Sequence, residues 1–442
     1  MLSMGIPMII SMVLQALYNI VDSAFISNMP QDGEDALNAL TLAFPFQMLM
    51  VAIAIGTGIG TNVLVAKNLG LGDKERASKV AGNAQFLAII IYVIFLLFGL
   101  FGVKFYISTQ TTNQTIYDMA VNYLSICCIV SPGIIFFGIY EKLFQATGHS
   151  MHSTIAMIAG AVINIVLDPI MIYGLLGFPE MGVKGAALAT VIGQCTSWFL
   201  ALVFHFKVNK SISKKLSYLK PSVKMIKGIY SVGLPAIIAQ ALMSVMTYGL
   251  NIILVSVSES MVTAYGLFYK IQQFVLFAAF GLRDAITPIV SFSYGMKNKE
   301  RIKDGIKYGL LYTSIIMLIG TIAVEILAQP FAKMFSLSGE TETVFVSAMH
   351  IITISFIFAG INIALQGVFQ ALNKGFESLI VSLGRQLVFV LPVAWAFAQF
   401  VSKTQSNHWI IWITFPIAEI VTLIIAYLLM KKINKNKISK IS

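Results

Sequence analysis

Charged side chains are scarce in this 442-residue chain. Asp, Glu, Lys and Arg make up 11% of the residues, apolar residues make up 57%, and the mean hydropathy is +0.84. A typical soluble domain carries about 25% charged residues. The composition therefore excludes a soluble globular domain and predicts an integral membrane protein.

Cysteine and histidine are also rare. Cys127, Cys128 and Cys195 lie inside apolar stretches and lack the spacing of a metal site, so we expect small buried side chains. The five histidines are scattered, and only His149 and His152 share a loop. No Walker motif for binding phosphate is present. We therefore expect no metal centre, no resident cofactor and no direct use of ATP.

What the chain does contain is a series of apolar stretches of about 20 residues, each long enough to cross a bilayer core of about 30 Å. No cleavable signal sequence precedes the first stretch, which begins almost at Met1, so the natural start could lie upstream. We predict an all-α membrane protein with twelve transmembrane helices, at residues 3–27, 37–66, 80–103, 119–141, 153–173, 183–206, 228–257, 261–294, 306–328, 343–372, 377–400 and 408–430.

Basic residues collect between alternate spans. Of the 30 Lys and Arg residues, 23 fall on the side of the membrane that holds the N-terminus and 4 on the other side. Because basic loops favour the cytoplasm, both termini are predicted to be cytoplasmic. The net charge of +11 is then a basic inner face beside anionic lipid, and no nucleic-acid partner is required.

The second half of the chain repeats landmarks of the first. Phe144-Gln145-Ala146 returns 225 residues later as Phe369-Gln370-Ala371, and Gly5-Ile6-Pro7 returns 228 residues later as Gly233-Leu234-Pro235. Six spans lie in each half, so the halves are predicted to be parallel six-helix bundles related by a pseudo-two-fold axis along the membrane normal, as in many transporters. The predicted domains are an N-terminal lobe (1–206), a cytoplasmic linker (207–227), a C-terminal lobe (228–430) and a basic tail (431–442).

Two acidic residues interrupt the apolar spans of the first half at the same depth. Asp22 lies about five residues before the outer end of span 3–27, and Asp168 lies about five residues before the outer end of span 153–173. At about 1.5 Å per residue, both lie roughly 7–8 Å below the outer boundary. A shared depth is what two groups of one site require.

Further oxygen ligands lie near these acids. Asn164 stands one turn deeper than Asp168 on the same helical face, Thr190 enters from span 183–206, and Pro169 should bend its helix. An all-oxygen set suits Na⁺, and two carboxylates close together would also share a proton near neutral pH. We predict an H⁺ or Na⁺ coupling site at Asp22, Asn164, Asp168 and Thr190. The alternative is that backbone groups or water satisfy each acid separately.

The second half carries intramembrane charges of both signs. Lys270 lies nearer the outside, and four charged residues lie deeper at similar levels. We predict that these four form a buried ion-pair network that locks helices together; the alternative is a second coupling site or a site for a substrate anion. The four residues are Arg283, Asp284, Arg385 and Glu419.

Two other acidic residues are interpreted as peripheral. Glu141 beside Lys142 is predicted to be a solvated or surface pair near the cytoplasmic face, and Glu325 is expected to reach water at an outer helix end.

Polar, methionine and aromatic side chains near helix middles are candidates for lining a substrate cavity. Such a lining suits flat, lipophilic cations, although plain packing or a surface that faces lipid would use the same residue types. The candidates are Gln15, Tyr18, Phe44, Gln47, Gln240, Met243 and Met246.

The repeated plan and several motifs together resemble the multidrug and toxic compound extrusion (MATE) family, most closely its MepA-like bacterial branch. The resemblance covers essentially the whole chain. The motifs are the segments 15–22 (QALYNIVD), 66–70 (AKNLG), 143–148 (LFQATG), 164–169 (NIVLDP) and 182–187 (GVKGAA).

This resemblance implies a V-shaped pair of bundles that exports organic cations against inward flow of H⁺ or Na⁺. The family's N-lobe cation site falls on Asp22, Asn164, Asp168 and Thr190. Some members also place an essential acid in the middle of the seventh span, where this chain has only Gln240 and Asn251 as large polar residues. A second-half site of that kind is therefore not expected.

The sequence thus predicts a secondary active multidrug efflux transporter that works by alternating access and is not an enzyme. Its expected partners are small organic cations and the lipid of a bacterial cytoplasmic membrane, in which it would act as a monomer. A flippase for lipid-linked oligosaccharides and an integral-membrane enzyme are the alternatives. Extra spans and a strongly cationic cavity would indicate the flippase, and a cluster of nucleophiles or metal ligands would indicate the enzyme.

Overall fold

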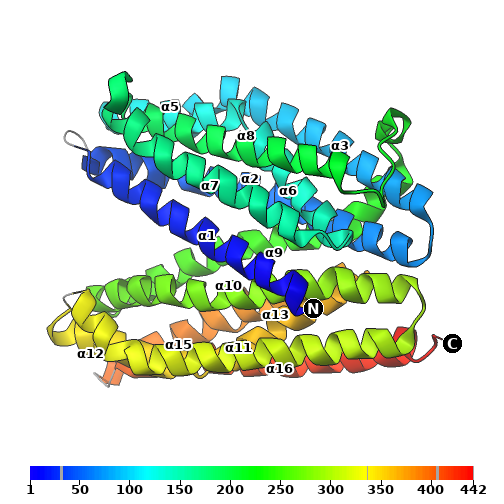
Figure 1. Ribbon diagram of the computed structural model, residues 1–442. Coiled ribbons are helices and arrows are strands. Elements are labelled where there is room, and N and C mark those ends of the chain that lie inside the picture. Colours follow the sequence, from blue (N-terminus) through cyan, green and yellow to red (C-terminus); the bar gives the residue numbers. More distant parts are fainter. Residues whose placement is uncertain (30–32, 336, 405–407, 442) are drawn as a thin grey trace. The chain divides into compact units, whose positions relative to one another are not determined.

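The computed structural model describes residues 1–29, 33–335, 337–404 and 408–441, in which every regular element is a helix (Figure 1). The first half contains α1 (Leu2–Ser27), α2 (Gly33–Gly70), α3 (Lys74–Leu97), η1 (Phe98–Gly102), α4 (Val103–Ser108), α5 (Gln114–Ile129), α6 (Pro132–Ala146), α7 (Ser150–Tyr173), η2 (Leu175–Gly177), α8 (Val183–Lys207) and η3 (Leu216–Leu219). The second half contains α9 (Val223–Val255), α10 (Glu259–Gly295), α11 (Lys299–Met334), α12 (Gly339–Thr353), α13 (Phe356–Ala371), α14 (Gly375–Leu383), η4 (Gly384–Val388), α15 (Val390–Thr404), η5 (His408–Ile413), α16 (Thr414–Ile433) and η6 (Asn434–Ile438).

Many of these helices can cross a membrane. Within the described residues, nine helices are long and apolar enough, or up to eleven if each of two bent pairs is one span, and residues Leu2–Leu17 form a shorter apolar helix. Each of the twelve predicted spans overlaps a helix or a run of consecutive helices. The predicted all-α membrane class is confirmed.

The bent pairs occupy equivalent places in the two halves. Helices α5 and α6 meet at 47°, and α12 and α13 meet at 50°. Pro132 is the first residue of α6, a position at which a backbone N–H has no hydrogen-bond partner within the helix. Because proline lacks this N–H and its ring would clash with the preceding turn, α5 cannot continue through Pro132 as one straight helix.

The short turns that precede α3 and α11 also repeat. The Asp73 carboxylate accepts a hydrogen bond from the Arg76 N–H at 2.8 Å, and the Asn298 side chain accepts one from the Arg301 N–H at 3.0 Å. Both are helix N-caps. The residue before each cap has a positive φ; this residue is Gly72 in the first half and Lys297 in the second. The sequence repeat is therefore also a repeat of local backbone structure.

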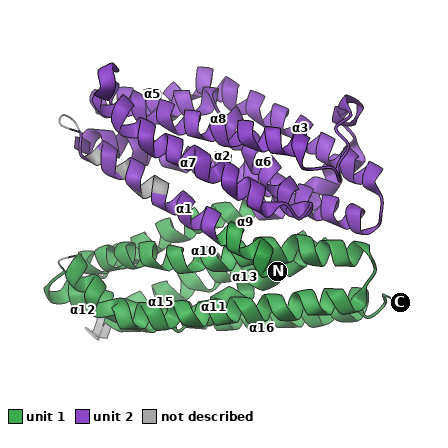
Figure 2. Cartoon of the chain, in the orientation of Figure 1, with its two compact units in different colours: residues 1–9, 238–442 green, residues 10–237 purple. Residues whose placement is uncertain are grey.

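Two compact units make up the chain (Figure 2). Unit 1 contains residues 1–9 and 238–442, and unit 2 contains residues 10–237. Helices α1 and α9 are thus each divided between the units. The predicted lobes follow the sequence repeat. In the compact units, by contrast, the first segment of α1 belongs with the second half of the chain, and the first segment of α9 belongs with the first half.

Close backbone packing explains this exchange. A Cβ on Gly281 of α10 would lie 2.8 Å from the Ile9 nitrogen, so the start of α1 packs within unit 1. A Cβ on Gly60 of α2 would lie 2.0 Å from the Ile229 oxygen, so the start of α9 packs within unit 2. Small residues permit this approach between membrane helices.

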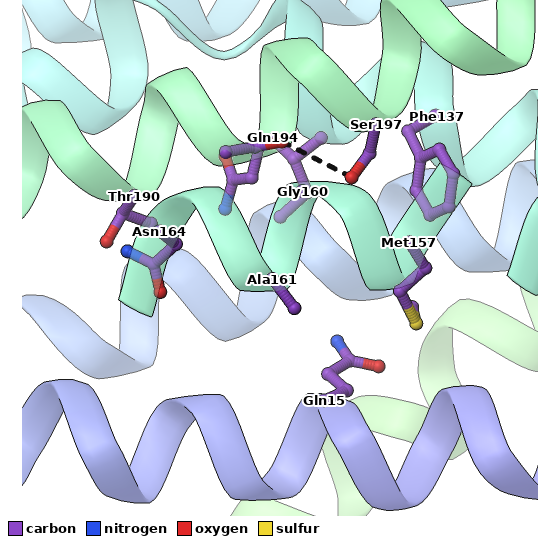
Figure 3. Close-up of a pocket in the computed structure, with 11 residues that line it drawn as sticks. Gln15, Phe137, Met157, Gly160, Ala161, Asn164, Thr190, Gln194 and Ser197 are labelled. Carbon is purple, nitrogen blue, oxygen red and sulfur yellow. Dashed lines mark hydrogen bonds between the residues drawn. The ribbon is translucent and has the colours of Figure 1, made fainter. Parts of the chain in front are cut away.

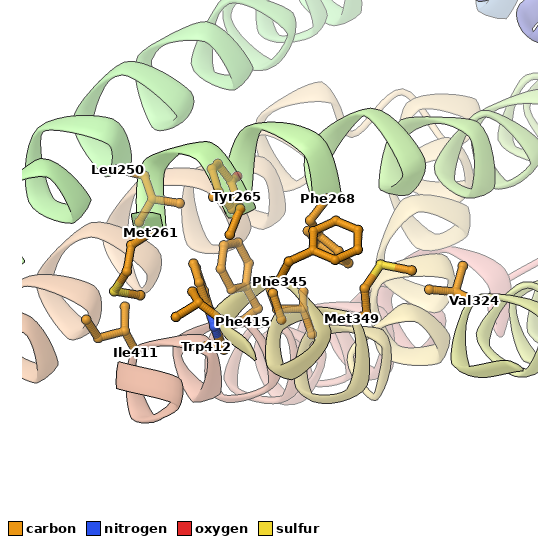
Figure 4. Close-up of a cluster of buried hydrophobic side chains, with 14 of the residues drawn as sticks. Leu250, Met261, Tyr265, Phe268, Val324, Phe345, Met349, Ile411, Trp412 and Phe415 are labelled. Atoms are coloured by element: carbon orange, nitrogen blue, oxygen red, sulfur yellow. The ribbon is translucent and has the colours of Figure 1, made fainter. Parts of the chain in front are cut away.

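Each unit has its own apolar core. In unit 1, Tyr265 and Phe268 of α10, Phe345 of α12 and Trp412 of η5 pack in one cluster (Figure 4). In unit 2, a cluster that includes Leu124 of α5 joins α1, α2, α4, α5, α7 and α8. These cores hold the polar residues of each unit at defined positions.

Candidate functional site

Helix α7 positions two of the four predicted site residues. Asn164 Nδ2 donates a hydrogen bond to Asp168 Oδ1 at 3.1 Å, as the spacing of four residues predicts. Asp168 has 0% of its surface exposed, and Asn164 is buried as well. Pro169 follows inside the same helix. Burial leaves the carboxylate dependent on neighbours within unit 2.

Helix α8 brings Thr190 to the same place because the two helix backbones nearly touch. A Cβ on Gly193 would lie 2.7 Å from the Gly160 oxygen and 3.0 Å from the Asn164 Cβ. The glycines therefore allow α8 to lie directly against α7. Thr190, three residues before Gly193, lies beside Asn164 at one end of a cavity (Figure 3).

Helix α1 supplies the second acid. Asp22 is 8% exposed and lies in unit 2, as Asp168 does. The C-terminal ends of α1 and α7 are tied by a 2.6 Å hydrogen bond from the Tyr173 hydroxyl to the Phe25 carbonyl oxygen, and the two rings pack edge to face. Asp22 and Asp168 are thus both buried near the joined ends of α1 and α7, and their membership of one cation site stays a prediction.

Each of the four predicted residues holds a buried oxygen without a hydrogen-bond partner. These atoms are Asp22 Oδ1, Asn164 Oδ1, Asp168 Oδ2 and Thr190 Oγ1. Buried polar atoms are normally satisfied, and leaving one unpaired costs about 1–3 kcal/mol. Four such oxygens within unit 2 are of the type that a hard cation such as Na⁺, or a proton shared between two carboxylates, would require.

A cavity of about 70 Å³ extends from this group into unit 2 (Figure 3). Asn164 and Thr190 lie at one end and Phe137, Met157 and Ser197 at the other, and the Ser197 hydroxyl donates to the Gly193 carbonyl oxygen. The lining residues are Gln15, Ile134, Phe137, Met157, Gly160, Ala161, Asn164, Thr190, Gly193, Gln194 and Ser197.

Of the predicted substrate-cavity residues, Gln15 lines this cavity together with two of the cation-site residues. Phe44 is 54% exposed, and Gln47 donates to the Tyr123 hydroxyl at 3.3 Å within unit 2. The side chain of Tyr18 lies outside the described residues. Three further candidates, Gln240, Met243 and Met246, are half-buried in unit 1.

Sequence reasoning missed the polar lining contributed by α8. Gln194 and Ser197 follow Thr190 by four and seven residues, so the three share one helical face. This periodic polar stripe was the signal that could have revealed them. Of the three cysteines, Cys127 and Cys128 are buried as predicted, and Cys195 is partly exposed.

The four charged residues predicted to form a buried network in the second half form two ion pairs. Arg283 Nη2 lies 2.8 Å from Asp284 Oδ1, and Arg385 Nη2 lies 2.8 Å from Glu419 Oε1. Asn362 Nδ2 also donates to Glu419 Oε2 at 2.8 Å. The second pair therefore joins η4, α16 and α13, three helical segments of unit 1. Lys270 is exposed.

The structure corrects the interpretation of Glu141 and Lys142 as a solvated or surface pair. Lys142 is 2% exposed, and the Glu141 side chain is 14% exposed. Their burial results from packing of α6 against α2, which adjacent charges in a sequence do not reveal. Glu325, expected to reach water, has a side chain that is 35% exposed; it also pairs with His350 and accepts a hydrogen bond from the Thr353 hydroxyl.

Known proteins resemble the chain along its whole length. The MatE family model matches residues 7–170 and again residues 235–396, once in each half. A multidrug export protein, MepA of Staphylococcus aureus strain bovine RF122 / ET3-1, is 24% identical over 98% of this chain and 94% of its own length.

Two solved structures share the fold and are 27% identical to the chain, each with a TM-score of 0.90. One is a MATE protein crystallised in complex with MaL6, and the match covers 100% of this chain and 96% of that one. The other is the outward-facing conformation of a multidrug resistance MATE family transporter of the MOP superfamily, and the match covers 98% of this chain and 96% of that one.

Proposed function

Because the chain belongs to the MatE family, we propose that it is a secondary active transporter that exports lipophilic organic cations in exchange for H⁺ or Na⁺. Its relatives include multidrug export proteins. The proposal makes the protein a carrier and not an enzyme. It places the chain in a bacterial cytoplasmic membrane with both termini inside, where it works as a monomer.

The observation that carries this proposal is the group of unpartnered oxygens of Asp22, Asn164, Asp168 and Thr190. Two carboxylates buried among apolar helices need a cation, because an isolated buried charge is costly. Bound Na⁺ or a shared proton would remove that cost. The oxygen set suits either ion, so the coupling ion is H⁺ or Na⁺.

Exchange follows if the carboxylates alternate between the two kinds of cation. When the site faces outward, an incoming H⁺ or Na⁺ neutralises Asp22 and Asp168, and a cationic drug loses its counter-charge and leaves. When the site faces inward, the small ion departs and the carboxylates again attract a cationic drug. Gln15 and the apolar lining of the adjoining cavity support contact with flat, lipophilic parts of such a drug.

The available ion gradients supply enough energy for this exchange. Each pH unit corresponds to about 1.4 kcal/mol, and each 100 mV to about 2.3 kcal/mol per charge moved. Exchange of one proton per drug across two pH units would sustain roughly a hundredfold drug gradient.

The proposal is tested by ethidium efflux from proteoliposomes under an imposed pH gradient or an imposed Na⁺ gradient. We expect one of these gradients to drive efflux by the native protein. Asp168→Asn and Asp22→Asn should reduce that efflux at least 20-fold, because an amide neither binds a proton nor attracts Na⁺ as a carboxylate does.

The matched control is Asp118→Asn, which removes an exposed acid of α5. It should transport at the native rate, and all three variants should elute as folded monodisperse protein. Native protein that responds to neither gradient, or folded Asp168→Asn that transports normally, would contradict the proposal.

A further inference from the structure

Helix α6 carries a largely buried ion pair at the end of unit 2 that is predicted to face the cytoplasm. Lys142 Nζ lies 3.8 Å from Glu141 Oε1, and the same Oε1 accepts a hydrogen bond from Gln145 Nε2 at 3.0 Å. Burying two charges carries a desolvation penalty of several kcal/mol for each ion. Such a pair contributes little net stability. Its position in the fold therefore suggests a role other than stabilisation.

The surrounding contacts hold this pair in a defined position. The Gln145 Oε1 accepts a hydrogen bond from Asn62 Nδ2 of α2 at 3.4 Å. A Cβ on Gly58 of α2 would lie 2.7 Å from Lys142 Cγ, so the lysine stem lies directly over the α2 backbone. The carboxylate is therefore positioned by groups on two helices.

Glu141 lies on the helical face that lines the cavity. Ile134 and Phe137 of α6 line the cavity that begins at Asn164, and Glu141 follows them by seven and four residues. At 3.6 residues per turn these three side chains share one face. The polar lining of α8 runs in the same direction, from Thr190 to Ser197.

Polar groups on α1 and α7 extend in the same direction. Ser11, one turn before the cavity residue Gln15, donates a hydrogen bond to the Thr154 hydroxyl at 2.9 Å, and both side chains are buried. Thr154 lies three residues before Met157, which lines the inner end of the cavity. Buried hydroxyls on two helices thus lie one turn beyond the cavity.

We infer that Glu141 is an inner station for the coupling cation, which it receives from the Asp22–Asp168 site along this polar track inside unit 2 and passes to the cytoplasm. This inference deepens the proposed function and rests on it. It assigns the ion a route within one helical unit.

The transfer needs no further reactant. For H⁺, the O–H bond of the protonated outer carboxyl breaks, water carries the proton inward, and a new O–H bond forms at Glu141. Loss of that proton to cytoplasmic water restores the carboxylate. For Na⁺, the ion exchanges oxygen ligands. Lys142 beside Glu141 favours release, since its positive charge opposes a second cation.

Other titratable groups near this end of α6, among the described residues, include Tyr140 of α6, His149, which packs against His152, and Lys214 near His205. His152 of α7 stacks with Phe144, and His205 of α8 packs against Tyr140 at 5.2 Å between ring centroids. Glu141 is thus the carboxylate among Lys142, His152, His205 and Tyr140.

The internal repeat places an uncharged amide where this acid stands. Glu141 corresponds, at the shift of 225, to Gln366 of α13, which is also buried. Asp22 corresponds, at the shift of 228, to the apolar Leu250. The outer and inner acids therefore occur together in one half and are both absent from the other.

The test compares Glu141→Gln with the native protein in proteoliposomes, with ethidium as the drug and the effective ion gradient as the driving force. We expect the maximal rate to fall at least tenfold, because the ion can no longer leave inward. The ethidium KM and the half-saturating outer ion concentration should change less than twofold, because the outer site is intact. Glu141→Asp should recover at least a third of the native rate.

Glu75→Gln is the matched control, because Glu75 forms a 2.8 Å pair with Lys79 on exposed α3 surface. It should leave all three quantities unchanged. A native maximal rate in Glu141→Gln, while Asp168→Asn is inactive, would overturn the inner station and leave the proposed function standing. An equal loss in Glu141→Asp, accompanied by a lower unfolding temperature, would make Glu141 merely structural and would also overturn it. Failure of the native protein to respond to either gradient would overturn both proposals.

Discussion

The side-chain amide of Asn164 uses its two ends differently. Its Nδ2 donates to Asp168 Oδ1, whereas its Oδ1 has no hydrogen-bond partner. The donor end therefore orients the carboxylate, and the acceptor end adds an oxygen to the site. The spacing of four residues predicted this pairing from sequence, because α-helix geometry alone puts the two side chains on one face.

The Arg385–Glu419 pair distinguishes a structural lock from a second coupling site. Arg385→Met should destabilise the protein by about 3–5 kcal/mol, because it leaves the Glu419 carboxylate buried without its partner. The double variant Arg385→Met/Glu419→Leu should recover most of that stability, since neither charge remains buried. Thermal unfolding in detergent measures both changes.

Transport by the double variant decides the role. A structural lock predicts ethidium efflux within about threefold of the native rate once stability is restored. The Asn362 amide also donates to the Glu419 backbone oxygen at 3.0 Å, so this contact between α13 and α16 survives the change. A stable double variant without efflux would instead indicate a coupling or substrate site in the second half.

At the scale of elements, small residues determine how closely α8 approaches its neighbours. Gly160 of α7 lies against the α8 backbone at Gly193, and a Cβ on Gly133 of α6 would lie 2.6 Å from the Cys195 nitrogen. Three consecutive residues of α8 are therefore in contact with two other helices. This close approach is what sets Thr190 beside Asn164.

Gly193→Ala should separate α7 from α8, because the added methyl group would lie 2.7 Å from the Gly160 oxygen. Overpacking of this kind costs about 1–3 kcal/mol, and displacement of Thr190 should weaken coupling-ion binding at least fivefold. Thermal unfolding and the ion dependence of efflux measure the two effects. Gly266→Ala of α10 is the control, because nothing lies within 4 Å of the added Cβ. Equal behaviour of the two variants would disprove this account of the packing.

At the scale of the whole molecule, the connection between the halves is held against unit 2. Asn83 of α3 donates to the Lys220 carbonyl oxygen at 3.3 Å, and its Oδ1 accepts from the Ser222 N–H at 2.7 Å. The Ser213 N–H donates to the Ser78 hydroxyl at 2.8 Å. The Lys-rich linker is therefore an ordered part of the molecule that leads directly into α9.

Asn83→Ala should release this linker, because it removes hydrogen bonds from both ends of the side-chain amide. We expect trypsin to cleave the variant near Lys215 and Lys220 at least fivefold faster than the native protein. Asn28→Ala provides the control. The Asn28 amide donates to the carbonyl oxygen four residues earlier, and the Asn83 amide makes the same kind of bond to Lys79. Unchanged cleavage in Asn83→Ala would show that other contacts hold the linker.

The repeat was readable in the sequence, but its exchange of segments was not. Gly5-Ile6-Pro7 and Gly233-Leu234-Pro235 marked the starts of two equivalent helices. Their chain neighbours gave no sign that residues 1–9 pack within unit 1 and residues up to 237 within unit 2. Which surfaces those glycines meet depends on long-range packing.

The sequence by itself determined the membrane class, the approximate spans and the internal repeat, and it predicted the grouping of Asp22, Asn164, Asp168 and Thr190. These features follow from hydropathy, helix periodicity and depth, which are local or additive properties of the chain. Only the tertiary structure decided that Lys142 is buried, that Glu141 is largely covered, and that Gln194 and Ser197 line a cavity with Gln15. Burial and cavity lining depend on which neighbouring helix covers each face, and that is a property of packing between segments far apart in the chain.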